Sequence, residues 1–312
     1  MTTEKRIADA ASHYPLAAEV CSGILEQGRN LLAKQIAYQA ETHGEAFWEE
    51  AQRLVALSQS LGGKPVEAIL EYTLAYLKEQ AAFVATGEYS NDSFDTVNEN
   101  VYSNPDVMLG FYLDGLMLSH AFWPIHFDMH KFYRREFLSR VPDAGVGAEF
   151  GFGHGLYLHD LLLESQERIV HGYDISEHAI QFAGRLLAQA GLPEHRYQLN
   201  AGNVCKPMDL ASGSLRWAIC AEVMEHIPDP VFSFGQIQSF LQPGAPFFIT
   251  TVANSNAIDH LHLFTDISQV HDVLEQAGLQ VVAEQSFAVA DYAAASRDPT
   301  VDFAFVCVPQ GS

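Results

Sequence analysis

Cysteine is scarce in this sequence. Four cysteines occur in 312 residues, far apart and without a C-x-x-C pair. This spacing argues against a zinc ribbon or a disulfide framework and is typical of a reducing compartment. The chain also lacks an apolar run long enough to span a bilayer, and no apolar core of a signal peptide follows the N-terminus. We therefore expect a cytoplasmic protein without a signal peptide or a membrane helix.

Positive charge is also scarce. The sequence has 17 Lys and Arg against 39 Asp and Glu, a formal net charge of −22. Such an excess of carboxylates repels phosphate backbones and anionic lipids, and no cluster of basic residues offsets it locally. We expect neither nucleic acid nor a membrane surface as a partner.

The length and the change of pattern along the chain indicate two domains. A chain of 312 residues, 48% apolar and 18% charged, is too long for one small core. We predict a helical N-terminal or lid domain over 1–140 and an α/β domain over 141–312. An all-helical extension is a common dimerisation device, so a homodimer through it is an open alternative.

Apolar residues recur at three- and four-residue steps in the first part. This period predicts helices over 24–38, 47–61 and 66–84, and further helices over 105–122 and 125–140. The predicted helix over 66–84 carries an apolar stripe that runs from Val66 through Leu74 to Val84.

The polar residues 90–104 predict a loop, and the region after it is dense in aromatic residues and histidines. It is either a helix pair that packs on the next domain or a lid that supplies an aromatic-lined pocket. As a lid, it would bind the substrate through Tyr102, His120, His126 and Tyr133.

Two histidines in this region have metal-ligand spacing. His126 and His130 stand at i and i+4 of a predicted helix, but Phe127 occupies the position where a zincin motif needs glutamate. Without a third ligand, the sequence favours no metal here.

From residue 146 onwards, strand-like and helix-like segments alternate. This order is typical of a doubly wound, mostly parallel sheet with helices on both faces. Little separates the last two strands, which we expect to form an antiparallel hairpin at one edge. The seven strand-like segments are 147–150, 168–173, 197–199, 215–220, 246–251, 280–283 and 301–308.

A glycine-rich stretch follows the first of these strands. Gly151, Gly153 and Gly155 alternate with other residues before a helix that opens near Leu156. Glycines allow a sharp turn and close approach to a ligand, and the helix then presents unpaired N–H groups there. Asp174 ends the second strand and can accept both hydroxyls of a ribose. The pattern predicts a nucleotide-type cofactor.

The spacing of the glycines distinguishes two cofactors. A dinucleotide fingerprint, G-x-G-x-x-G, needs glycine at 156, where Leu156 stands. The sequence instead reads E-x-G-x-G-x-G from Glu149 to Gly155, which favours an adenosyl cofactor over a nicotinamide dinucleotide.

These motifs resemble those of the class I S-adenosylmethionine-dependent methyltransferases. The stretch from Glu149 to Gly155 is similar to their first motif and Tyr173–Ser176 to their second. Residues 200–204 resemble the segment after strand three, and 241–245 the turn before strand five. Residues 221–230 and 260–265 are similar to segments of the ubiquinone-biosynthesis-type branch. The resemblance covers about residues 145–290.

The resemblance implies S-adenosylmethionine as the cofactor. It places the glycine loop on the amino-acid part, Asp174 on the ribose, and the segment that contains Glu222 beside the cofactor. The implied cofactor-binding residues are Glu149, Gly151, Gly153, Gly155, Asp174, Ile175, Asn203, Val204 and Glu222.

Methyl transfer from a sulfonium needs alignment, and a weakly basic acceptor also needs a general base. The candidate bases are His226, His260, His262 and Glu222, and the three histidines are our catalytic candidates. Asp259, His260 and His262 are an alternative ligand set for a divalent metal, although we favour none.

We expect a methyltransferase that acts on oxygen, nitrogen or carbon of a small, partly aromatic or apolar acceptor. Two alternatives are a catalytically inactive S-adenosylmethionine-binding regulatory or scaffold protein and, less favoured, an NAD-dependent oxidoreductase.

Overall fold

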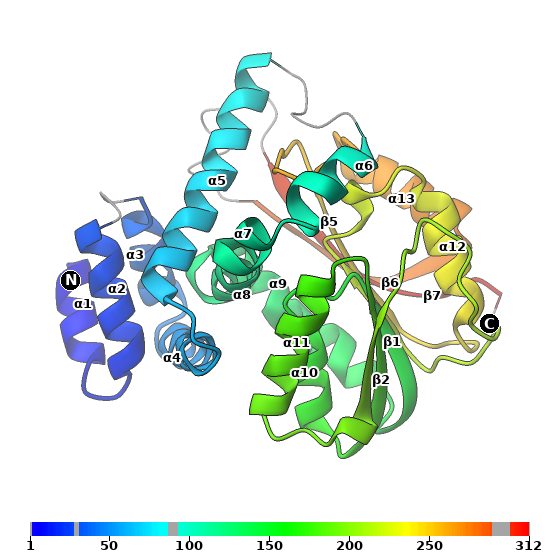
Figure 1. The fold of residues 1–312 in the computed structure, drawn as a ribbon, viewed down its shortest axis with the longest axis horizontal. Coiled ribbons are helices and arrows are strands. Elements are labelled where there is room, and N and C mark those ends of the chain that lie inside the picture. Colours follow the sequence, from blue (N-terminus) through cyan, green and yellow to red (C-terminus); the bar gives the residue numbers. More distant parts are fainter. Residues whose placement is uncertain (1, 28–30, 87–92, 289–299, 312) are drawn as a thin grey trace.

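The chain divides into a helical region and a sheet region. The computed structural model describes residues 2–27, 31–86, 93–288 and 300–311. The region up to residue 140 is helical, and the first strand begins at Ala144 (Figure 1). The elements of the helical region are α1 (Thr3–Ala10), α2 (Pro15–Gln27), α3 (Ala33–Thr42), α4 (Glu45–Ser60), α5 (Pro65–Thr86), α6 (Phe94–Val97), η1 (Asn98–Tyr102), α7 (Pro105–Val107), η2 (Met108–Tyr112), α8 (Leu113–Phe122), α9 (Pro124–Phe132), η3 (Tyr133–Phe137) and η4 (Leu138–Arg140).

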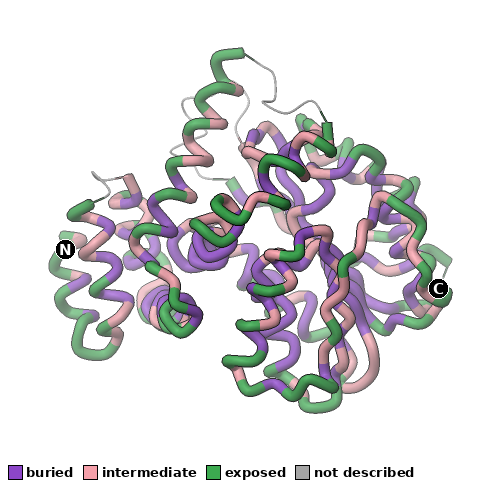
Figure 2. Tube along the Cα trace, viewed as in Figure 1, coloured by how far each residue is buried: buried purple, intermediate pink, exposed green. Residues whose placement is uncertain are grey.

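Two predictions for this region are wrong in detail. Residues 94–102, expected as a loop, are helical because the Ser93 hydroxyl accepts a hydrogen bond from the Thr96 N–H at 3.2 Å, and Val97 and Val101 then bury one face. Residues 90–92 of that predicted loop lie outside the described residues. The apolar stripe of α5 is buried only as far as Thr73, and Leu74 and Val84 are 56% and 71% exposed (Figure 2).

The second region is built on a seven-stranded sheet in the order β3-β2-β1-β4-β5-β7-β6. Strands β1 to β5 pair in parallel, and β7 is antiparallel to both β5 and β6. These pairings confirm the predicted doubly wound sheet and the antiparallel hairpin at one edge. The strands are β1 (Ala144–Phe150), β2 (Glu167–Asp174), β3 (Tyr197–Ala201), β4 (Ala218–Ala221), β5 (Phe247–Ala253), β6 (Leu279–Phe287) and β7 (Val301–Pro309).

Helices cover both faces of the sheet. On one side lie α10 (Leu156–Glu164) and α11 (Glu177–Gln189), and on the other α12 (Pro230–Phe240) and α13 (Ile267–Gln276) (Figure 1). The inner strand β5 is therefore buried along its whole length, as is typical of a strand with both faces covered.

The order of the strands creates a crevice at the centre of the sheet. From β1 the chain moves to β2 and β3 on one side, whereas from β4 it moves to β5 on the other. Loops that leave neighbouring strands in opposite directions open a gap at the carboxyl ends of those strands, where such sheets bind ligands.

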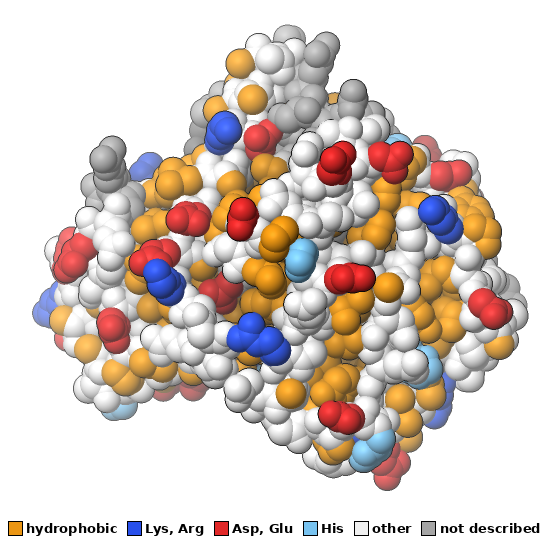
Figure 3. Space-filling model, in the orientation of Figure 1, with side chains coloured by type: hydrophobic (Ala, Val, Ile, Leu, Met, Phe, Trp, Pro, Cys, Tyr) orange, Lys and Arg blue, Asp and Glu red, His pale blue; other side chains and the backbone are white. Residues whose placement is uncertain are grey.

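The described surface reflects the composition. Acidic side chains outnumber basic ones on the face shown in Figure 3. Among the described residues, no helix combines the length and the apolar character needed to cross a bilayer.

Candidate functional site

A cavity of about 480 Å³ lies at the carboxyl ends of the strands. The loops after β1, β2, β3, β4 and β5 form one wall, and α5, η2, α8 and α9 of the helical region form the other. One cavity therefore joins the glycine loop to the aromatic residues of the helical region. Its volume is in the range of small-molecule sites.

The glycine loop has the backbone that its sequence predicts. Gly151, Gly153 and Gly155 have φ values of +72°, +49° and +75°, which side chains disfavour. Gly155 is the residue before α10, and the N–H of Leu156 donates to His154 Nδ1 at 3.0 Å. A histidine side chain thus satisfies one of the N–H groups at the start of this helix.

The three glycines differ in what a side chain would meet. A Cβ on Gly151 would lie 2.5 Å from Val223 Cγ2, and one on Gly155 would lie 2.7 Å from Ala183 Cβ. Gly155 does not line the cavity and instead allows α10 to pack closely on α11. Gly153 lines the cavity, and a Cβ there would meet no atom within 4 Å. Gly153 therefore leaves open space for a ligand.

Asp174 is fixed beside the glycine loop. One of its carboxylate oxygens accepts from the Gly153 N–H at 2.9 Å, and the other accepts from the Ser176 N–H at 2.8 Å. A carboxylate has about four lone-pair positions, so these hydrogen bonds leave it able to accept from a ligand. Burial raises the pKa of Asp174 to about 6, although these backbone N–H groups oppose the shift.

The next part of the wall comes from the loops after β2 and β3. Ile175, Asn203 and Val204 line the cavity here. Asn203 Oδ1 accepts from the Cys205 N–H at 2.8 Å, which fixes the orientation of the side chain. Glu149, 1% exposed, also lines the cavity, and burial and the charge of Asp174 raise its pKa well above its usual range.

The helical region supplies an aromatic wall. Tyr72 and Trp123 line the cavity together with Tyr102 and Tyr112. The hydroxyls of Tyr112 and Tyr102 donate to Asp259 Oδ2 at 2.7 and 3.3 Å. Asp259 follows β5, so these contacts join the two regions across the cavity.

Carboxyl groups gather at the same end. Glu222, Glu225 and Asp302 line the cavity, whereas no Lys or Arg of the described residues does. Burial and the neighbouring acids raise the pKa of Glu222 and Asp302, and burial raises that of Glu225 to about 8. Glu222 has φ of +52°, an unfavourable conformation for a side chain that is often found at functional sites.

Two of the predicted catalytic histidines lie beside these acids. His226 and His260 line the cavity, and their ring centroids are 5.0 Å apart. Burial and His226 lower the pKa of His260 to about 4. His262 does not line the cavity and packs on Phe264 with ring centroids 4.5 Å apart. The structure therefore separates His262 from the other two candidates.

A second group of histidines lies further along the cavity. His120 and His126 line it together with His154, and the ring of His120 lies 5.6 Å from that of His126 and 5.2 Å from that of His154. Burial lowers the pKa of all three, to about 4 for His126 and about 3 for His154. They therefore present neutral hydrogen-bonding groups at neutral pH.

The pair at metal-ligand spacing is divided between two environments. His126 Nδ1 lies 2.6 Å from the Ser119 hydroxyl. His130 instead lies between Glu50 and Asp160, at 3.2 and 3.0 Å.

The structure places Tyr133, a predicted substrate-binding residue, away from the cavity. Tyr133 has no exposed surface and does not line the cavity. Its hydroxyl donates to the Tyr157 carbonyl at 2.9 Å, and its ring packs against Tyr157 and Phe248. Tyr133 therefore packs in the core between the helical region and the sheet region.

Several residues that line the cavity were not predicted from the sequence. Tyr72 and Tyr76 lie four residues apart on α5, and this spacing marks one face of a helix. Asp302 gave no such signal, because only the pairing of β7 with β5 brings it to the cavity.

Residues 149–289 match the family model described as a methyltransferase domain. No curated protein gives a significant match. Among solved structures, phosphoethanolamine N-methyltransferase 2 of Haemonchus contortus, in complex with S-adenosyl-L-methionine, is 12% identical. The match covers 71% of this chain and 61% of that chain, with a TM-score of 0.51. At this identity the likeness shows the fold.

Two other solved structures are less similar in shape. An S-adenosylmethionine-dependent methyltransferase from Aquifex aeolicus is 15% identical, covering 70% of this chain and 98% of that chain, with a TM-score of 0.44. The [4+2]-cyclase SpnF is 14% identical, covering 78% and 97%, with a TM-score of 0.49.

Proposed function

We propose that this chain, whose residues 149–289 match a methyltransferase domain, uses S-adenosylmethionine to methylate a small, partly aromatic or apolar acceptor. The observation that carries the proposal is the single cavity that joins the glycine loop and Asp174 to the aromatic wall of the helical region. A donor on the glycine loop and an acceptor on the aromatic wall would then share one enclosed space, which aligns them and excludes water.

Cofactor binding is assigned to the residues around the glycine loop. Gly151 and Gly153 would lie against the amino-acid part of S-adenosylmethionine, and Asp174 would accept from the ribose hydroxyls. Ile175, Asn203 and Val204 would flank the adenine. Gly155 would act through helix packing, since a Cβ there would meet Ala183.

The residues at the end of the cavity away from the glycine loop restrict the kind of acceptor that can bind. Tyr72, Tyr102 and Trp123 offer flat apolar surface, while the half-buried Glu222 and the buried Asp302 add carboxyl groups. A phosphorylated acceptor would need cationic groups, and the described lining contains no Lys or Arg. We therefore favour a neutral or cationic acceptor, with His120, His126 and His154 available as hydrogen-bonding partners.

The helical region would act as a lid over this acceptor. Some of its contacts with the sheet region lie in the cavity wall, such as the hydrogen bond from the Tyr112 hydroxyl to Asp259. The placement in the ubiquinone-biosynthesis-type branch, the cytoplasmic location, the absence of nucleic-acid partners and the homodimer stay predictions from the sequence.

The reaction is tested with a labelled methyl donor. The chain is incubated with S-adenosylmethionine carrying a labelled methyl group and the small-molecule fraction of a cell extract, with Asp174→Ala as the control. We expect label in small molecules with the wild type and less of it with Asp174→Ala. Label solely in protein or nucleic acid, or none although S-adenosylhomocysteine binds, would contradict the proposal, and the second result would favour the regulatory alternative.

The substitution Asp174→Ala should weaken binding of S-adenosylhomocysteine by about 1–3 kcal/mol, because it leaves the ribose hydroxyls without an acceptor. Titration calorimetry measures the change. Unchanged affinity would show that the ribose does not contact Asp174.

Binding of S-adenosylhomocysteine should also depend on pH. Burial raises the pKa of Asp174 to about 6, and hydrogen bonds from a ribose would favour the ionised carboxylate and lower that pKa in the complex. Affinity should therefore be highest above about pH 7 and fall as the pH drops below about 6. Calorimetry across this range should show the decline in the wild type and a flatter profile in Asp174→Asn.

A further inference from the structure

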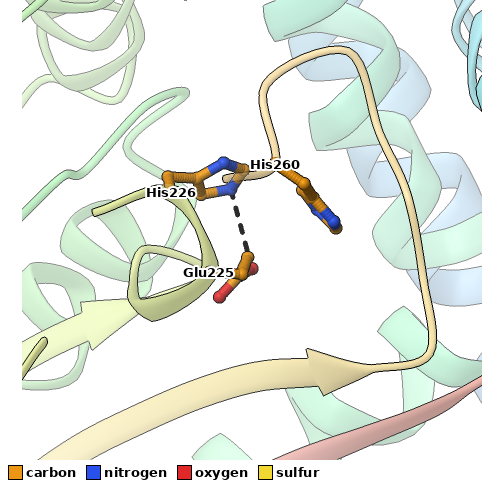
Figure 4. A group of neighbouring side chains, drawn as sticks. All are labelled: Glu225, His226 and His260. Carbon is orange, nitrogen blue, oxygen red and sulfur yellow. Dashed lines mark ion pairs between the residues drawn. The ribbon is translucent and has the colours of Figure 1, made fainter. Parts of the chain in front are cut away.

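The geometry points to a divalent-cation site made by Glu225, His226 and His260 at the acceptor end of the cavity. One potential ligand atom from each residue lies within 4.8 Å of those of the other two. Glu225 and His226 come from the turn after β4, and His260 comes from the loop after β5 (Figure 4). Neighbouring parallel strands thus bring His260 beside Glu225 and His226, which lie far from it in the sequence.

The hydrogen bonds of the two histidines orient them as ligands. His226 Nδ1 lies 2.8 Å from the Asp259 carbonyl oxygen, and His260 Nδ1 lies 3.1 Å from the Ser255 carbonyl oxygen. A carbonyl oxygen only accepts, so in each ring Nδ1 carries the proton and Nε2 carries the lone pair. Metal-binding histidines typically donate their second N–H to a carbonyl or carboxylate in this way.

Glu225 provides the oxygen ligand. Its side chain has no exposed surface, and one carboxylate oxygen, Oε2, accepts from the Thr251 hydroxyl at 2.7 Å. Among the described residues, no N–H group donates to the other oxygen, Oε1, which lies 3.6 Å from His226 Nε2, and the Glu225 carboxyl group also neighbours that of Glu222. A buried carboxylate oxygen without a donor is costly, and a bound cation would remove that cost.

The ligand set selects the class of metal. Two imidazole nitrogens and one carboxylate suit Zn²⁺, Mn²⁺ or Fe²⁺ rather than Ca²⁺ or Mg²⁺, which prefer oxygen ligands alone. Ligand bonds of about 2.0–2.2 Å place the ligand atoms about 3–3.5 Å apart, so only small side-chain rotations are needed. Three protein ligands leave coordination positions open for another molecule.

The three residues lie where a bound cation could contact the methyl acceptor. Glu225 and His226 follow Glu222 by three and four residues, and all three line the cavity. Resting on the proposed function, a cation here would bind an oxygen of the acceptor and stabilise its deprotonated form. His226 and His260 would then hold the cation rather than act as general bases.

The site is tested with Co²⁺, a spectroscopic substitute for Zn²⁺. The full chain is treated with a chelator and titrated with Co²⁺ while visible absorption is followed, and bound metal is counted after equilibrium dialysis. We expect one Co²⁺ per chain, displaced by Zn²⁺. His260→Ala and Glu225→Gln should each lower the affinity at least about 100-fold, more than the loss of an outer-shell partner does.

His262→Ala is the matched control, because His262 lies two residues from His260 but outside the cavity. It should bind Co²⁺ like the wild type. Binding of S-adenosylhomocysteine, measured on the same samples, reports whether each variant is folded and tests the cofactor site separately. A wild type that binds S-adenosylhomocysteine but no Co²⁺, or a folded His260→Ala with unchanged Co²⁺ affinity, would overturn the metal site and leave the proposed function standing.

Discussion

Replacing Gly153 by leucine should lower the affinity for S-adenosylhomocysteine by at least about 100-fold, or about 2.7 kcal/mol. Gly153 lines the cavity, and a Cβ there would meet no protein atom within 4 Å. The apo protein can therefore accommodate the side chain, whereas the proposed cofactor position cannot. Titration calorimetry would measure the loss.

Backbone strain must be separated from this steric effect. Gly191 has φ of +69°, and a Cβ there would also meet no atom within 4 Å, but Gly191 does not line the cavity. Gly191→Leu should cost a similar amount of stability, about 1–2 kcal/mol, for the left-handed backbone. It should bind S-adenosylhomocysteine normally. Equal affinities of the two variants would contradict the position of the cofactor.

The substitution Asp160→Ala should destabilise the fold by about 3 kcal/mol. Asp160 on α10 is 6% exposed, and its carboxylate lies 2.8 Å from Arg53 of α4 and 2.6 Å from Arg134 of η3. Its removal would leave Glu50 as the remaining carboxylate partner of both guanidinium groups where the helical region meets the sheet region. Breaking a buried ion pair typically costs about 3–5 kcal/mol. We expect a loss near the lower value because the Arg134 side chain is 45% exposed. Urea denaturation would measure the loss.

Acidification should have a related effect. Burial alone would raise the pKa of Asp160, but His130, His159 and Arg53 outweigh it and hold the pKa well below its usual range. A lowered pKa in the folded state gives stability that is fully present above the unfolded pKa of about 4 and is lost as the pH falls further. Asp160→Ala should lack this part of the acid sensitivity.

Asp128→Ala is the control for the ion pair, since Asp128 pairs with the half-exposed Lys131 at 3.1 Å. A surface pair contributes about 0–1 kcal/mol. If Asp160→Ala were no more destabilising than Asp128→Ala, the buried ion pairs would not hold the two regions together.

The sheet and the glycine-loop end of the cavity were predictable because their signals are local. The run from Glu149 to Gly155 contains a strand end, a turn and a helix start, and Asp174 ends the next strand. In parallel sheets, such neighbouring strand ends fall at the same edge. The positive φ angles of the glycines and the contact of Asp174 with the Gly153 N–H agree with that expectation.

The acceptor end was less predictable because its residues come from distant elements. Tyr72 of α5, Tyr112 of η2 and Asp302 of β7 meet only after the helical region docks on the sheet. Tyr133 and His262 had suitable side chains, but one is buried in the core and the other lies outside the cavity. Residue type and sequence neighbourhood do not determine which side of an element faces a cavity.

The most direct test of this account is calorimetric titration of the wild-type chain with S-adenosylhomocysteine and, separately, with NADH. We predict saturable binding of one S-adenosylhomocysteine per chain, abolished or strongly weakened in Gly153→Leu and retained in Gly191→Leu, with no binding of NADH. Binding of NADH without binding of S-adenosylhomocysteine would contradict the assignment of the glycine loop to the methyl donor.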